Sequence, residues 1–213
     1  MSKKIPATTS NPSRKLLSII GTVLGWFAVL GQLVLIITNR QAGVIETIIR
    51  FFSFFTILTN ILVSLYFSSQ IINRRSLKFI KNDSALTAIT AFILIVGLVY
   101  QIVLRSIWEP KGFQMVIDEL LHTVIPIYTL MYWFLYVKFQ NLKLRYLFGW
   151  LLYPVIYFIF IIVRGQYSGY YPYPFIDVAS IGLTKVLINF IILSVFAMIL
   201  LAALYLVARL KNK

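Results

Sequence analysis

The chain has 213 residues, of which 60% are hydrophobic, 16% aromatic and 12% charged, and its formal net charge is +14. One soluble domain cannot hide this much apolar surface from water, so the composition excludes an ordinary soluble protein and predicts a membrane protein. The chain has no cysteine, which excludes disulfides and thiolate chemistry, and its single histidine excludes a His-rich metal site. We therefore expect no metal and no other cofactor.

Runs of apolar residues recur along nearly the whole chain, and each is long enough to cross a hydrocarbon core of about 30 Å. They predict an all-α, polytopic membrane protein, a six-transmembrane-helix bundle that forms one domain over residues 16–208. The basic segment 1–15 has the composition of a disordered arm, and residues 209–213 are expected to form a basic tail. The predicted spans are 16–37, 47–72, 85–106, 114–137, 146–164 and 184–208.

The positive charge is distributed in a way that indicates topology. If the N-terminus is inside, fourteen of the 20 Lys and Arg residues fall on inner segments. This positive-inside pattern predicts that both termini are cytoplasmic, and it explains the charge without a nucleic-acid partner. The six basic residues on the outer side are Arg40, Arg50, Arg105, Lys111, Arg164 and Lys185.

The second predicted span carries polar side chains in an otherwise apolar sequence, FSFFTILTN. In a continuous helix, Thr56 follows Ser53 by three residues and Asn60 follows Thr56 by four, so all three share one face. Small polar residues of this kind either pack between helices or belong to a functional site.

His122 is the only histidine and lies in the fourth predicted span. Asp118 and Glu119 precede it at i−4 and i−3, so either carboxylate could reach the imidazole along one helix face. Pro126 has no N–H for the carbonyl of His122, which predicts a kink there, and Pro154 acts similarly in the fifth span. Because broken helices are tolerated where a cavity or protein supplies new partners, the two prolines indicate a cavity.

Polar residues of other spans are expected at a similar depth. Gln101 and Arg105 lie in the third span and Asn189 in the sixth, so the polar layer is about 8 to 15 Å below the outer surface. Arg105, Arg164 and Lys185 also fit an interpretation as snorkelling anchors.

The segment YYPYPF (Tyr170–Phe175) is typical of an interfacial aromatic belt. Asp177, which follows it, is expected to be a solvated loop residue or a helix cap.

Three segments resemble a known family when they are taken in order. They are ELLHTVIP (Glu119–Pro126), YPVIYFIFIIVRG (Tyr153–Gly165) and YPYPFIDV (Tyr171–Val178). Together they resemble the androgen-induced and androgen-dependent TFPI-regulating membrane proteins and their bacterial relatives, over roughly Glu46 to Tyr205. The resemblance implies a multi-pass protein of the plasma membrane of a bacterium.

The animal members of this family are intramembrane threonine hydrolases that cleave fatty-acid esters of hydroxy fatty acids. The resemblance implies that His122 takes the place of the essential histidine and that Ser53 occupies the frame of the essential threonine. Thr56 is the nearest threonine, one turn deeper, so both hydroxyls are candidate nucleophiles with His122 as the base.

The remaining catalytic roles are hypotheses from expected geometry. Asn60 or Asn189 could donate to an oxyanion, and Asp118 or Glu119 could orient the imidazole. The expected partners are membrane lipids and a lipid-ester substrate that enters from the bilayer.

Two other classes fit the same polar layer. A transporter or lipid-binding protein would hold a ligand there without breaking it. A structural subunit would use the polar residues to hold its helices together. A haem or metal electron carrier is disfavoured because the layer offers few axial ligands. The sequence assigns no oligomeric state.

Overall fold

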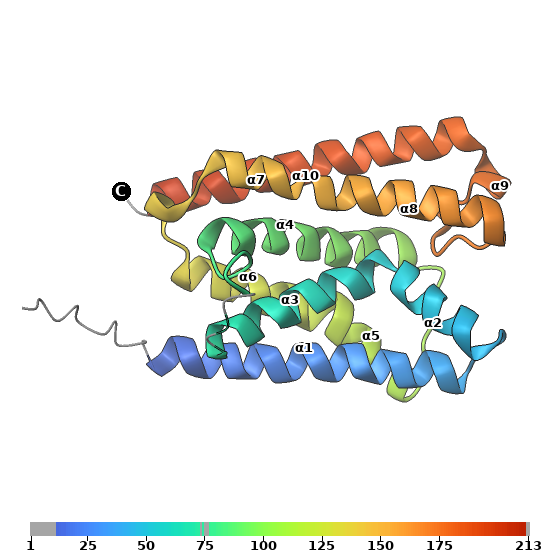
Figure 1. The fold of residues 1–213 in the computed structure, drawn as a ribbon, viewed down its shortest axis with the longest axis horizontal. Helices are drawn as coiled ribbons and strands as arrows, with labels where there is room; N and C mark the ends of the chain where they lie inside the picture. Colours follow the sequence, from blue (N-terminus) through green and yellow to red (C-terminus); the bar gives the residue numbers. More distant parts are fainter. Residues whose placement is uncertain (1–11, 73, 75–76, 212–213) are drawn as a thin grey trace, which may run out of the picture.

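The computed structural model describes residues 12–72, 74 and 77–211 of the chain, and this part is all-helical. The longer helices lie side by side along the bundle, roughly parallel to its long axis (Figure 1). The α-helices are α1 (Pro12–Thr38), α2 (Val44–Ser53), α3 (Phe55–Ile71), α4 (Asp83–Val99), α5 (Phe113–Glu119), α6 (Ile125–Tyr136), α7 (Leu144–Trp150), α8 (Leu152–Ser168), α9 (Val178–Ile181) and α10 (Leu183–Lys211). Two π-helical turns, η2 (Tyr100–Leu104) and η3 (Leu120–Val124), and two 3-10 turns, η4 (Phe139–Asn141) and η5 (Pro174–Ile176), complete the order.

The predicted all-α class is confirmed, and several helices are compatible with a membrane protein. Within the part of the chain that the structure describes, four helical stretches are long and apolar enough to cross a membrane: 12–38, 83–104, 144–168 and 183–211. The bent pair α2 and α3 gives a fifth if it counts as one span. The stretch that was expected to span at 114–137 forms α5, η3 and α6, and it is not among these helices.

Both predicted tails are partly helical. α1 begins at Pro12, so residues 12–15 belong to the first helix and not to a disordered arm, while residues 1–11 lie outside the described residues. α10 continues to Lys211, so most of the expected tail 209–213 is helical and only residues 212 and 213 lie outside the description.

The second predicted span is not one straight helix. Phe54 adopts an extended conformation, and α2 and α3 meet there at a bend of 73°. Ser53 is therefore the last residue of α2 and Thr56 the second residue of α3, which corrects the expectation that they share one continuous face. Tyr157 Oη donates to the Ser53 carbonyl over 2.9 Å, and the Thr56 N–H donates to Tyr173 Oη over 3.2 Å. Two tyrosines thus satisfy main-chain groups that the break leaves unpaired.

The two prolines coincide with irregular helix. The π-helical turn η3 contains His122 and ends just before Pro126, as expected for a residue that supplies no N–H. Gly97 of α4 packs against this turn, and a Cβ at Gly97 would lie 2.9 Å from the His122 carbonyl oxygen. At Pro154, the break falls at Leu151, between α7 and α8.

The core is centred on α4, most of whose side chains are buried among the neighbouring helices. Trp133 Nε1 of α6 donates to Thr87 Oγ1 of α4 over 2.8 Å, which satisfies both groups inside this core. α1 and α3 approach closely at Gly25. A Cβ added to Gly25 would lie only 2.3 Å from Ser64 Oγ. This small-residue contact is typical of helix packing in membranes.

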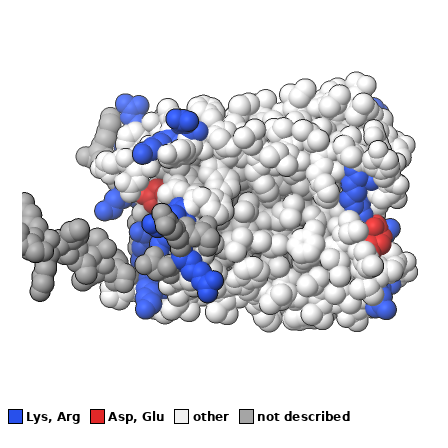
Figure 2. Space-filling view, in the orientation of Figure 1, with Lys and Arg blue, Asp and Glu red and all other residues white. Residues whose placement is uncertain are grey.

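Charged side chains gather at the two ends of the bundle. Figure 2 shows Lys and Arg at both ends, with more at the end near the chain termini, and a broad uncharged band between them on the face shown. Large apolar side chains are exposed along the same helices, for example Val23, Ile156 and Ile191. An uncharged apolar band of this kind suits contact with lipid.

We expect Gly25→Leu to lower the stability of the protein, because the larger side chain would meet Ser64 across the α1 and α3 contact. Overpacking of this kind costs about 1 to 3 kcal/mol. Thermal unfolding in detergent measures it, with Gly149→Leu as the control, since a Cβ at Gly149 meets nothing within 4 Å. Equal melting temperatures for the two variants would contradict the predicted packing.

Candidate functional site

A cavity of about 830 Å³ lies at the end of the bundle where α2, α5 and α9 are found, on the right in Figure 1. Its walls come from α1, α2, α3, α5 and both π-helical turns, together with the loops at this end. Thr56, Tyr100, Asp118, His122 and Tyr173 line it. The cavity therefore combines the candidate base with one of the two candidate nucleophiles.

His122 is held in one orientation. Its Nδ1 lies 2.9 Å from the main-chain oxygen of Asp118, and its ring stacks on Tyr100 with 4.0 Å between ring centroids and 12° between planes. A carbonyl oxygen only accepts hydrogen bonds, so Nδ1 carries the proton when the imidazole is neutral. Nε2 then holds the lone pair, which is the form that a general base needs.

The two carboxylates next to His122 bind other groups, which corrects the expectation that one of them contacts the imidazole. Asp118 accepts from Trp108 Nε1 at 2.6 Å and from Gln114 Nε2 at 3.0 Å. Glu119 is ion-paired with Arg105 at 2.6 Å. The imidazole is instead oriented by the main chain of Asp118.

The structure separates the two candidate nucleophiles. Thr56 is in the first turn of α3 and lines the cavity, and its Oγ1 lies 3.3 Å from Tyr173 Oη. Ser53 is fully buried at the end of α2, where its hydroxyl donates to the Ile49 carbonyl over 2.7 Å. Ser53 does not line the cavity. Thr56, and not Ser53, therefore shares a space with His122.

Tyr173 was expected in an interfacial belt, but its side chain is buried against Thr56. Its ring stacks on Phe175, with 5.1 Å between centroids, and Asn189 Nδ2 holds the same segment by donating to the Phe175 carbonyl over 2.8 Å. Burial raises the pKa of the Tyr173 phenol above its ordinary value, so the hydroxyl stays protonated. The sequence signal that could have assigned Tyr173 to the site is its place in the segment YPYPF.

Asn60 connects the start of α3 to the turn η3 through hydrogen bonds. Its Nδ2 donates to the carbonyls of Thr56 at 2.9 Å and Leu121 at 3.3 Å, so it ties the start of α3 to the turn that carries His122. Asn60 is fully buried, is not part of the cavity wall, and its Oδ1 has no protein partner. Its role is therefore to position the site.

Four other polar residues that the sequence singled out, Gln101, Arg105, Arg164 and Asp177, lie outside the cavity wall. Gln101 and Arg105 are exposed and form a network with Glu119 and Thr123. Arg164 does not extend into solvent as an anchor: its side chain is 9% exposed, and it is ion-paired with Glu46 at 2.7 Å. Asp177 caps α9 by accepting from the N–H groups of Ala179 and Ser180.

A second, smaller cavity of about 100 Å³ adjoins the first. Thr56, Leu104 and Tyr173 line both cavities. The other walls of the small cavity are almost entirely apolar and come mainly from α3, α4, α8 and α10. Thr56 thus lies between a large cavity, whose wall includes His122 and other polar side chains, and a small apolar cavity whose wall does not include His122.

Within the described residues, no group of three or more His, Asp or Glu side chains is arranged to hold a metal ion. Comparisons of the chain with family models, with curated proteins and with solved structures give no match. The geometry of the two cavities is therefore the basis for assigning a function.

We expect Tyr173→Phe to destabilise the protein, because the Thr56 N–H would lose its acceptor inside the bundle. A buried group left unpaired costs about 1 to 3 kcal/mol. Thermal unfolding in detergent measures the effect against Tyr167→Phe, whose side chain is 90% exposed and should be neutral. A Tyr173→Phe variant as stable as Tyr167→Phe would contradict the predicted role of the hydroxyl.

Proposed function

We propose that the protein is an intramembrane hydrolase of lipid esters in which Thr56 is the nucleophile and His122 the general base. The observation that carries this proposal is that both residues, from different helices, line one cavity. The tautomer of His122 adds support, because its hydrogen bond to the Asp118 carbonyl leaves Nε2 free to accept a proton.

The chemistry follows the pattern of a hydroxyl nucleophile with a histidine base. His122 Nε2 takes the proton of Thr56 as Oγ1 attacks the ester carbonyl, which gives a tetrahedral oxyanion. The oxyanion collapses, the bond to the alcohol oxygen breaks, and His122 returns the proton to that alcohol. Water then attacks the acyl-Thr56 ester with the same base, which releases the acid and restores the threonine.

The start of α3 supplies groups that favour an oxyanion. The positive end of the helix dipole lies there, although the N–H of Thr56 itself donates to Tyr173 Oη. The protonated hydroxyl of Tyr173 is 3.3 Å from Thr56 Oγ1 and can donate in the same region. The two asparagines are less suited, because Asn60 and Asn189 already donate their amide protons to carbonyls.

The finer membrane topology is part of the proposal. We propose six membrane passes with both termini in the cytoplasm, in the plasma membrane of a bacterium. The segregation of basic residues along the sequence supports this orientation, since the loops between successive helical stretches alternate in charge. The site then lies in the outer half of the bilayer, where water can enter from outside.

Single cysteines test the number of passes, because the natural chain has none. If α5, η3 and α6 together cross the membrane, Lys111→Cys and Gln140→Cys lie on opposite sides. We expect a membrane-impermeant maleimide to label Lys111→Cys in intact cells and Gln140→Cys only after the membrane is opened. Labelling of both positions in intact cells would reduce the number of passes.

Covalent labelling tests the proposed nucleophile. We expect a fluorophosphonate probe to modify Thr56 of the purified wild type, because His122 activates its hydroxyl. Mass spectrometry of the adduct should show that Thr56→Ala and His122→Ala lose the label, while Ser53→Ala keeps it. Thr56→Ser is the matched positive control, since it retains a hydroxyl at the same position.

The outcome is judged only on variants that stay folded in detergent. Modification of Ser53 by the probe would identify Ser53, and not Thr56, as the nucleophile. A folded wild type that neither takes the label nor hydrolyses a lipid-like ester would overturn the hydrolase and favour a protein that binds or transports a ligand in the same cavity.

A further inference from the structure

We infer that the small apolar cavity is the acyl subsite of the site described above, and that it accepts a short acyl group of about four carbon atoms. This inference rests on the proposed function and specifies its substrate class.

The small cavity shares part of its wall with the large one. Thr56 and Tyr173 belong to the walls of both cavities, while His122 belongs only to the large one. A carbonyl carbon attacked by Thr56 therefore has an open space on each side, one with the histidine and one without it.

The direction of proton transfer decides which half of the ester enters which cavity. The histidine of such a pair returns its proton to the leaving alcohol, so the alcohol must lie on the side of His122. The alcohol half then occupies the large cavity of about 830 Å³. The acyl half is directed to the small cavity, whose walls are apolar and suit a hydrocarbon chain.

The volume of the small cavity limits the length of the acyl group. An apolar cavity of about 150 Å³ in another protein holds one benzene molecule. The cavity beside Thr56 has about 100 Å³, so it holds a group smaller than benzene. A long fatty acyl chain exceeds this volume, so only about four of its carbon atoms would lie inside the cavity.

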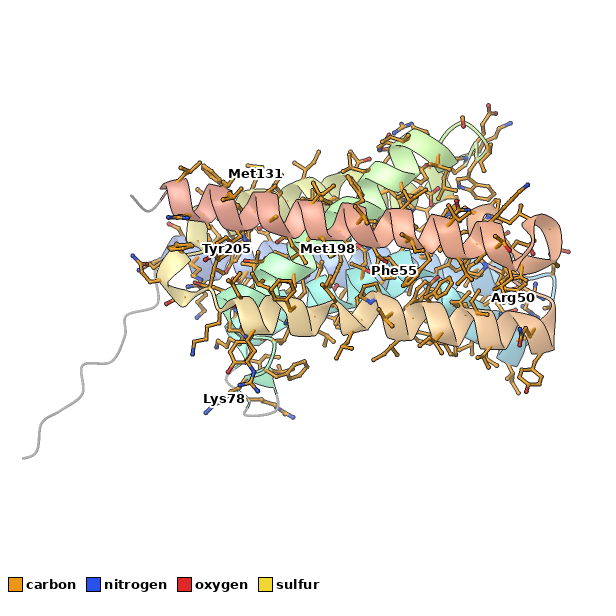
Figure 3. All side chains as sticks on the ribbon, turned by 90° about the horizontal axis from the view of Figure 1, so that it is seen from above. Arg50, Phe55, Lys78, Met131, Met198 and Tyr205 are labelled. Atoms are coloured by element: carbon orange, nitrogen blue, oxygen red, sulfur yellow. The ribbon has the colours of Figure 1, made fainter. Side chains whose placement is uncertain are left out.

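The walls are made by large, well-packed side chains. Phe92 of α4 is fully buried, and Ala197 of α10 is 2% exposed. Phe158 of α8 stacks on Phe190 of α10 with 4.0 Å between ring centroids, which joins the two helices beside the cavity. In Figure 3, which looks down on α8 and α10, Phe55 lies between these two helices, and it is part of the same wall.

The expected substrate is thus a short-chain ester of a larger, lipid-like alcohol. The large cavity has polar and charged lining residues, among them Gln32, Arg50 and Asp118, so the alcohol half carries polar groups. In such an ester, the longer apolar part belongs to the alcohol half and lies outside the acyl subsite.

Photoaffinity labelling tests the subsite without requiring hydrolysis. The probe is a diazirine-bearing pentanoyl amide, with a diazirine-bearing dodecanoyl amide as its long-chain counterpart. We expect the short probe to crosslink to peptides of α4, α8 and α10 that line the small cavity. Ala197→Leu, which extends an isopropyl group into the cavity, should lower this labelling by about tenfold, as for an overpacked site.

Ala202→Leu is the matched control, because the same substitution is made on α10 at an exposed position. Leu193→Ala, which enlarges the wall, should shift crosslinking and ester preference towards the longer chain, with exposed Ile192→Ala as its control. Crosslinks only on lipid-facing residues, or equal labelling of Ala197→Leu and Ala202→Leu, would overturn the acyl subsite.

Failure of this inference is distinguishable from failure of the proposed function. If the short probe labels the cavity but no ester is hydrolysed, the subsite stands and the hydrolase does not. If esters of all chain lengths are hydrolysed equally and Ala197→Leu changes neither rate nor labelling, the hydrolase stands and the acyl subsite is wrong.

Discussion

The arrangement of the site depends on a broken helix whose unpaired main-chain groups are satisfied by tyrosine hydroxyls. At Phe54 the chain turns by 73°, and inside an apolar bundle the groups on either side of the turn would be costly without partners. Tyr157 satisfies the Ser53 carbonyl and Tyr173 the Thr56 N–H. The first contact attaches α8 to the end of α2, and the second attaches the 170–177 segment to the start of α3, where Thr56 lines both cavities.

Helix irregularity also positions His122. In the π-helical turn before Pro126, the carbonyl of His122 faces Gly97. Only a residue without a Cβ allows such a close approach there. The ring is then confined between Tyr100 and the Asp118 carbonyl. The site thus combines two interrupted helices, and Asn60 connects them through hydrogen bonds to Thr56 and Leu121. Together the two interruptions border a cavity whose wall includes the polar side chains of Thr56, Asp118 and His122.

The sequence predicted the helical class and the four long apolar helices, because the length and composition of an apolar run are local properties. It also singled out His122 and Thr56, because an ionisable or polar residue in an apolar run stands out. It did not separate Thr56 from Ser53, since that depends on a break at Phe54 that no proline or glycine marks. The sequence wrongly predicted that Tyr173 lies at the membrane interface. Its burial is set by long-range packing against α3, which a local pattern does not reveal.

The missing contact between His122 and a carboxylate changes how the base is stabilised. In a Ser-His-Asp arrangement a carboxylate orients the imidazole and stabilises the imidazolium. Here a neutral carbonyl performs the orientation. The Asp118 carboxylate, 5% exposed and lining the same cavity, accepts hydrogen bonds from the neutral groups of Trp108 and Gln114. With both of these donors on its carboxylate, Asp118 orients the base through its main chain and not through its side chain.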